Sequence, residues 1–125
     1  MKLIQSPRVL IAPFLLAGLF LAAPLALADD FELKGDPSAG QQPYQQQCAS
    51  CHGNSGKGDG PAARAFNPPP ASLLRDELTA EHLFLVTRDG GMPHGLAPTM
   101  PAFNRSLSEQ QIHDVVAYLL SLRDE

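Results

Sequence analysis

The stretch that decides the fold is Cys48-Ala49-Ser50-Cys51-His52. It places two thiols three positions apart and a histidine directly after the second, which is the C-x-x-C-H arrangement that attaches a c-type haem. Within one turn of chain, both thiols can form thioethers with the two vinyl groups on one edge of a haem, and the histidine can reach the iron as its proximal ligand. The motif therefore predicts one covalent haem c per chain, bound through Cys48 and Cys51 and ligated by His52.

The same motif allows two other interpretations. A disulfide or a thioredoxin-like redox pair would use the same cysteine spacing, but such a pair is expected in a βαβ pattern that the sequence lacks. A zinc site would need a fourth ligand beside the two cysteines and His52. The other histidines stand at no paired ligand spacing, and each is expected to lie on a solvated polar surface: His82, His94 and His113.

The composition fits a single small domain. The chain has 125 residues, of which 18% are charged, and it contains 2 cysteines and no tryptophan, which suits one globular domain better than a repeat array or a disordered tail. The formal net charge of −4 leaves no basic excess to neutralise phosphates, and this argues against nucleic-acid binding.

The first 28 residues have the three parts of a secretory signal peptide. Lys2 and Arg8 precede an apolar run that closes on Ala26-Leu27-Ala28. We therefore expect export to the periplasm and cleavage after Ala28, which leaves residues 29–125 as the mature domain. Loss of the two basic residues leaves seven against 13 acidic ones, a net charge of −6. If the segment is retained instead, it is long enough to anchor the domain in a membrane.

Helical signals flank a long irregular middle, and no alternation of apolar and polar residues indicates a strand. An all-α fold is therefore predicted. Asp36-Pro37-Ser38 is typical of a helix start. Because a proline inside a helix costs about 3 kcal/mol, we expect Pro43 in the first turn of a regular helix that begins near Gly40 and runs into Cys48. Residues 53–70 are rich in glycine and proline and are predicted to form a long loop.

Two further helices have clear boundaries. Thr79 precedes a short helix over residues 80–88, and Gly90 with its neighbouring glycine ends it. Ser108 and Gln111 form a capping box at the start of a terminal helix. Apolar side chains recur along that helix at i, i+3, i+4, i+7 and i+8, so one face is expected to be buried: Ile112, Val115, Val116, Leu119 and Leu120.

Together these motifs resemble those of a bacterial class I cytochrome c, over nearly all of residues 36–124. The resemblance implies a small helical fold in which crossed N- and C-terminal helices and a short middle helix surround a covalently bound haem. The resemblance rests on the following motifs, in chain order: Gly40 and Tyr44 ahead of the C-x-x-C-H motif and Gly53, then Gly58-Asp59-Gly60-Pro61, Met100-Pro101-Ala102-Phe103 and Val116-Ala117-Tyr118-Leu119.

The resemblance also implies the iron ligands. His52 is similar to the proximal ligand and Met100 to the distal one, whose soft, neutral thioether favours ferrous iron. Pro61 is similar to the proline whose carbonyl accepts a hydrogen bond from the proximal imidazole. Met92 is also followed by proline, but Met100 is preferred because its segment lies just before the terminal helix. Met92 is then expected to fill space in the haem crevice.

Other residues receive structural roles from the resemblance. Gly40 is similar to the glycine that lets the terminal helices approach each other, and two tyrosines, Tyr44 and Tyr118, are expected around the crossing. Three arginines are candidates, by position alone, for contacts with the haem propionates: Arg64, Arg75 and Arg88.

The implied function is that of a periplasmic one-electron carrier. With both axial positions filled by the protein, no site remains for a substrate or for oxygen. An acidic monomer is expected to dock transiently, through small interfaces, on donor and acceptor proteins that carry basic docking patches. Two alternatives stay open: a haem c subunit of a larger oxidoreductase, and a peroxidase-like enzyme in which the Met100 bond opens.

Overall fold

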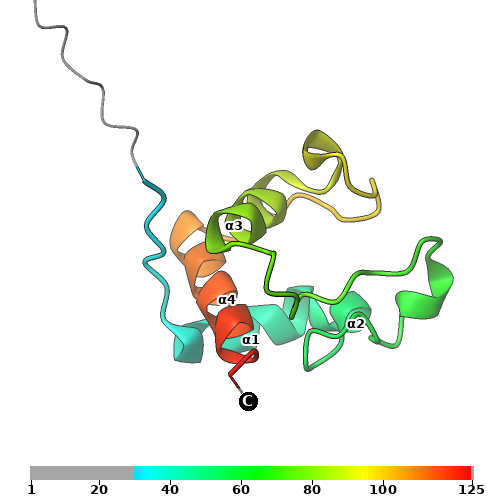
Figure 1. Cartoon of the computed structure of the whole chain (residues 1–125), viewed down its shortest axis with the longest axis horizontal. Helices are drawn as coiled ribbons and strands as arrows, with labels where there is room; N and C mark the ends of the chain where they lie inside the picture. Colours follow the sequence, from blue (N-terminus) through cyan, green and yellow to red (C-terminus); the bar gives the residue numbers. More distant parts are fainter. Residues whose placement is uncertain (1–29, 125) are drawn as a thin grey trace, which may run out of the picture.

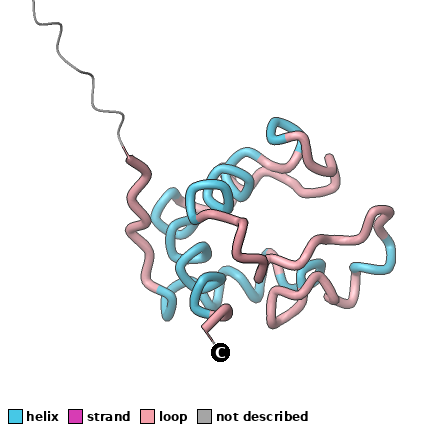
Figure 2. The backbone as a smooth tube through the Cα atoms, viewed as in Figure 1, coloured by secondary structure: helices cyan, strands magenta, loops and turns pink. Residues whose placement is uncertain are grey.

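The computed structural model of the protein describes residues 30–124. The predicted signal peptide, residues 1–28, lies outside the described residues. Within 30–124 the chain is all-helical and contains no strand, as the sequence predicts (Figures 1 and 2). No helix in that range is long and apolar enough to span a bilayer. The elements are α1 (Pro37–Gln47), α2 (Ala49–His52), η1 (Ala63–Ala65), α3 (Ala80–Asp89), η2 (Met92–His94) and α4 (Glu109–Ser121).

The terminal helices α1 and α4 cross at close range, as predicted (Figure 1). Gly40 permits the approach, because a Cβ at this position would collide with the Asp114 carbonyl on α4. Beside it, the rings of Tyr44 and Tyr118 lie 5.3 Å apart between centroids and are inclined by 54°. The glycine and both tyrosines therefore have the structural positions that the resemblance implies.

The first helix begins earlier than expected. It starts at Pro37 and keeps Pro43 in its interior, so the predicted start near Gly40 is wrong. Asp36 explains the difference: its carboxylate accepts a hydrogen bond from the Ser38 N–H at 2.8 Å. Its own N–H donates to Asp114 Oδ1 at 2.9 Å. These bonds fix the first turn against α4, which offsets the backbone donor that Pro43 lacks.

The predicted starts of the other two helices and the glycine stop at Gly90 are confirmed, although α3 continues one residue past the predicted residue 88. The Thr79 side chain caps α3, and Gly90 ends it with a φ of 84°. At the start of α4, Ser108 and Gln111 exchange both hydrogen bonds of the capping box. The apolar face of α4 lies in the core, where four of its side chains are at most 3% exposed: Ile112, Val115, Val116 and Leu119.

Backbone hydrogen bonds order the long middle segment around α2. The Gly58 N–H donates to the His52 carbonyl at 2.8 Å, and the Leu73 N–H donates to the Gly56 carbonyl at 2.7 Å. The loop that follows α2 therefore folds back on the end of that helix, and the next segment lies against the loop. This arrangement brings residues near position 71 to the histidine of the motif.

Candidate functional site

A cavity of about 640 Å³, lined mainly by apolar side chains, lies between α2, α3, α4 and the loops that connect them. Its size is in the usual range for cofactor sites. Four of the five predicted site residues line it: Cys48, Cys51, His52 and Met100. The apolar part of the lining includes Leu83, Val86, Phe103, Val115 and Leu119.

The motif forms a single helical turn that aims its side chains at this cavity. The Cys48 carbonyl accepts hydrogen bonds from the N–H groups of Cys51, at 3.2 Å, and of His52, at 2.9 Å. Gly53 ends the turn with a φ of 80°, and a Cβ there would collide with the Asp59 carboxylate. Glycine at position 53 therefore allows both this positive φ and the close approach of Asp59 where the chain leaves the motif.

The cysteines have the properties of structural thiols. Both are free, and Cys48 is buried. Burial raises the pKa of the Cys48 thiol to about 12, whereas redox-active cysteine pairs lower it. Across residues 30–124, no group of three or more histidine, cysteine or acidic side chains could hold a metal ion. These findings argue against the thioredoxin-like and zinc interpretations.

His52 is prepared for ligation through one ring nitrogen. Burial lowers its pKa, which favours the neutral imidazole that binds metals. Nδ1 lies 3.2 Å from the carbonyl oxygen of Ala71. If Nδ1 carries the proton and donates it there, Nε2 is left free as the ligand. The Ala71 carbonyl therefore stands at His52 Nδ1, and the assignment of Pro61 as the acceptor stays a prediction.

The two candidate methionines have different environments. Met100 is partly buried and lines the cavity, whereas Met92 is 71% exposed and lies outside the lining. The Met100 carbonyl accepts the Gly91 N–H at 2.9 Å, and its N–H donates to the Ala97 carbonyl at 3.1 Å. The expectation that Met92 fills the crevice is wrong, since η2 leaves it in solvent. We call residues 90–103 the methionine segment.

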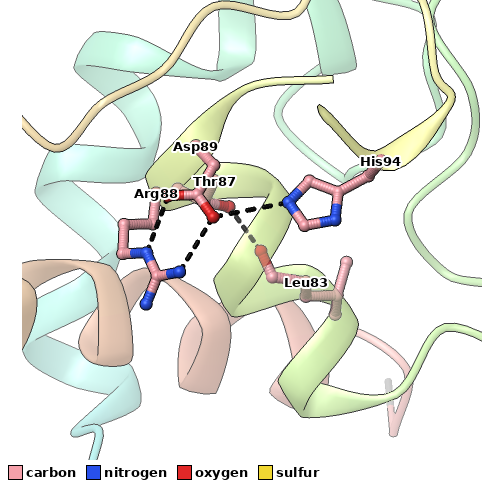
Figure 3. Close-up of polar contacts among 5 residues, drawn as sticks. All are labelled: Leu83, Thr87, Arg88, Asp89 and His94. Atoms are coloured by element: carbon pink, nitrogen blue, oxygen red, sulfur yellow. Dashed lines mark hydrogen bonds and ion pairs between the residues drawn. The ribbon is translucent and has the colours of Figure 1, made fainter. Parts of the chain in front are cut away.

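The methionine segment is held against α3 (Figure 3). The Asp89 carboxylate pairs with the Arg88 guanidinium at 2.7 and 2.8 Å, and His94 Nε2 lies 3.5 Å from its Oδ2. The hydrogen bonds from Arg88 lower the pKa of Asp89. At the other end of the segment, the Phe103 N–H donates to the Thr87 carbonyl at 3.0 Å. Both ends are therefore fixed, which holds Met100 at the cavity.

The remaining histidines are less solvated than expected. The His94 side chain is 21% exposed. His113 stacks on Phe84, with centroids 4.5 Å apart, and on Phe31, at 5.7 Å. His82 lines the cavity. The sequence prediction of solvated surfaces is therefore wrong for His94 and His113. Asp89, five positions before His94, pairs with it, and aromatic side chains from distant segments stack on His113.

Of the three candidate arginines, Arg75 lines the cavity and the other two do not. Arg75 also forms a half-exposed ion pair with Glu77 at 3.5 Å. Arg88 is engaged by Asp89, as described above, and Arg64 is exposed on η1. The structure therefore singles out one arginine that could contact an anionic group at the cavity.

Comparison with known proteins gives consistent matches. Residues 35–119 match the family described as cytochrome c oxidase, cbb3-type, subunit III. Cytochrome c-554(548) of Halomonas halodenitrificans is 31% identical over 70% of this chain and 96% of its own length. The cytochrome c subunit of a quinone alcohol dehydrogenase from Gluconacetobacter polyoxogenes is 36% identical over 64% of this chain, but that match spans only 18% of the subunit.

A solved structure is also similar. A chain of the reducing HAO-like protein complex of Kuenenia stuttgartiensis matches 69% of this chain and 43% of its own length, with a TM-score of 0.55 and 25% sequence identity. The matches thus include one protein of which nearly the whole length is covered. They also include larger proteins, less than half of whose own length is covered by the similarity.

Proposed function

The chain belongs to the cytochrome c family that its residues 35–119 match, and we propose that it is a periplasmic carrier of single electrons with one haem c. One observation carries the proposal: a single apolar cavity is lined by both motif cysteines, by His52 and by Met100. This donor set fits the group, with two thiols for its vinyl edge, and an imidazole and a thioether for the iron. When bound, haem c would supply a one-electron ferric/ferrous couple.

Each residue of the site has a distinct task in this proposal. Cys48 and Cys51 hold the group through thioethers. His52 presents Nε2 as the proximal ligand, because its other nitrogen faces the Ala71 carbonyl. Met100 would offer a soft thioether sulfur to the iron, and with it bound no open iron site would remain for a substrate or for oxygen. The apolar lining excludes water, and together with the thioether it favours the ferrous state.

Net charge suggests the chemistry of the partners. A mature chain that starts at residue 29 carries a net charge of −6, so donor and acceptor proteins with basic docking patches would be favoured. Electrostatic steering of this kind predicts association rates that fall as salt is added. If electron-transfer rates with a basic partner do not depend on salt concentration, electrostatic steering is excluded.

A second candidate function is that of a haem subunit in a larger oxidoreductase. It is favoured by the similarity to alcohol dehydrogenase subunits and to a chain of an HAO-like complex. Size-exclusion chromatography of the protein from its native host separates the two functions. A carrier elutes as a monomer, whereas a subunit elutes together with its partners.

Optical spectroscopy tests the proposed ligation. The protein would be exported from a host with haem-attachment machinery, and wild type would be compared with Met100→Ala and Met92→Ala. We expect a sharp reduced α band and a weak methionine-to-iron charge-transfer band that only Met100→Ala loses. Met92→Ala is the matched control, because it removes the same side chain from a solvent-exposed position.

The contrary results are equally specific. Loss of the charge-transfer band in Met92→Ala, but not in Met100→Ala, would show that Met92 is the distal ligand and that the proposed role of Met100 is wrong. A wild-type protein that is five-coordinate, or that readily binds added ligands, would favour the peroxidase-like alternative over the carrier.

A further inference from the structure

The middle of the methionine segment, residues 92–99, is tied to α3 by one side chain. Within the described part of the protein, the backbone hydrogen bonds of this stretch stay inside the segment. The N–H groups of His94 and Leu96, for example, donate to the Gly91 carbonyl at 3.1 and 2.9 Å. The polar contact with α3 comes from His94, whose Nε2 lies 3.5 Å from Asp89 Oδ2 (Figure 3).

His94 lies across a face of α3 that leads to the cavity. Asp89 and His82 are seven positions apart on this helix and therefore share a face. The His94 ring meets the His82 ring edge-on, with centroids 6.4 Å apart and an interplanar angle of 76°. His82 in turn lines the cavity. A displacement of His94 would therefore uncover α3 next to the site.

Both partners of the contact are prepared for it. The Asp89 carboxylate is held by the Arg88 guanidinium at 2.7 and 2.8 Å, and these hydrogen bonds lower its pKa and keep it charged. His94 Nε2 is buried and makes no hydrogen bond of regular geometry within residues 30–124. Because a buried N–H is costly to leave without an acceptor, the facing carboxylate favours this position of the imidazole.

We propose that Asp89 and His94 form a latch that keeps the methionine segment closed over the cavity, and that they are positioning residues for Met100. This inference rests on the proposed function. Gly91 connects the latch to the ligand, because its carbonyl accepts the His94 N–H and its own N–H donates to the Met100 carbonyl at 2.9 Å. A movement of His94 away from α3 is thus passed to the backbone of Met100. The strength of the latch sets how often the iron is open to a small ligand.

Binding of imidazole to the ferric, haem-loaded protein measures this opening. Imidazole binds only after Met100 has left the iron, so at saturating imidazole the stopped-flow rate equals the rate at which the methionine dissociates. Asp89→Asn removes the charge of the latch and keeps its shape, and His94→Phe keeps a ring and removes the N–H. Glu81→Gln is the matched control, since it removes an exposed carboxylate from the same helix.

We expect Asp89→Asn and His94→Phe each to raise the saturating rate about tenfold, which corresponds to about 1.4 kcal/mol. Glu81→Gln should leave the rate unchanged. The double variant should be no faster than the faster single variant, because both substitutions break the same contact. All variants should keep the methionine-to-iron charge-transfer band before imidazole is added. A merely structural role would lower the unfolding midpoint without changing the dissociation rate.

Two results would overturn the inference. One is a rate less than about threefold above that of wild type in both single variants, and the other is a double variant whose acceleration is the product of the two single effects. If one single variant yields no folded protein, the other decides by the same criterion. A wild-type protein that lacks the charge-transfer band would instead refute ligation by Met100, and with it the proposed function as well as this inference.

Discussion

Replacing Tyr44 by phenylalanine removes one buried hydroxyl and leaves the ring packing in place. The hydroxyl donates to the Gly53 carbonyl at 2.7 Å, and a buried hydrogen bond contributes about 0.5–1.5 kcal/mol to stability. That carbonyl keeps a second donor, the Gly56 N–H at 3.2 Å, so the larger cost of an unpaired acceptor is avoided. We therefore expect Tyr44→Phe to lower the free energy of unfolding by about 1 kcal/mol, which corresponds to roughly 4–8 °C in Tm for a domain of this size.

Denaturant unfolding of the haem-loaded protein measures this loss. The midpoint should fall while the m-value stays constant, because the packing and the surface buried on folding are unchanged. The matched control is Tyr118→Phe. Its ring forms the other half of the tyrosine pair, but its backbone carbonyl, not its hydroxyl, takes part in the hydrogen bond with Ser121. Equal stability of Tyr44→Phe and wild type would refute the argument, and so would equal losses in the two variants.

The same hydroxyl predicts a pH dependence. Burial raises the pKa of Tyr44 above its ordinary value of about 10. Below pH about 10 both states keep the proton and stability does not depend on this group. Above it the unfolded chain loses the proton while the folded chain retains it, so stability falls as pH rises. Unfolding midpoints measured on either side of this pH should show the decline in wild type and a smaller decline in Tyr44→Phe.

Two further predictions concern the helices and are checked by thermal unfolding. Gly40→Ala places a methyl group against the Asp114 carbonyl and should cost about 3 kcal/mol. Gly95→Ala, which meets nothing within 4 Å but has a φ of 70°, should cost only about 1–2 kcal/mol, and the reverse order would contradict the role of Gly40 at the crossing. Ser108→Ala removes the cap of α4 and should cost about 1 kcal/mol, whereas Ser108→Gly should cost a few tenths. Similar losses for both Ser108 variants would argue against the capping contribution.

Features of the fold that depend on neighbouring residues could be predicted from the sequence. The capping box at Ser108, the glycine that ends α3 and the apolar face of α4 all arise within a few positions. The start of α1 could not be predicted, because Asp36 is fixed by Asp114, 78 residues away. Local helix propensity at Pro43 favours a later start, and it does not include this distant contact.

The candidate site shows the same division. The motif from Cys48 to His52 is local, and the preference for Met100 over Met92 follows from the position of its segment before the last helix. The contact of His52 with the Ala71 carbonyl could not be predicted, because any residue can supply a backbone carbonyl and the alanine side chain carries no signal for it.

Intact-mass analysis with peptide mapping of the exported protein shows directly whether haem is attached to the motif. We expect one haem adduct per chain, located on the peptide that contains both Cys48 and Cys51. The same spectrum reports whether the mature chain begins at Asp29, as the predicted cleavage requires. A chain that carries free thiols or a Cys48–Cys51 disulfide and no haem, after export from a host with haem-attachment machinery, would contradict covalent haem attachment at this motif.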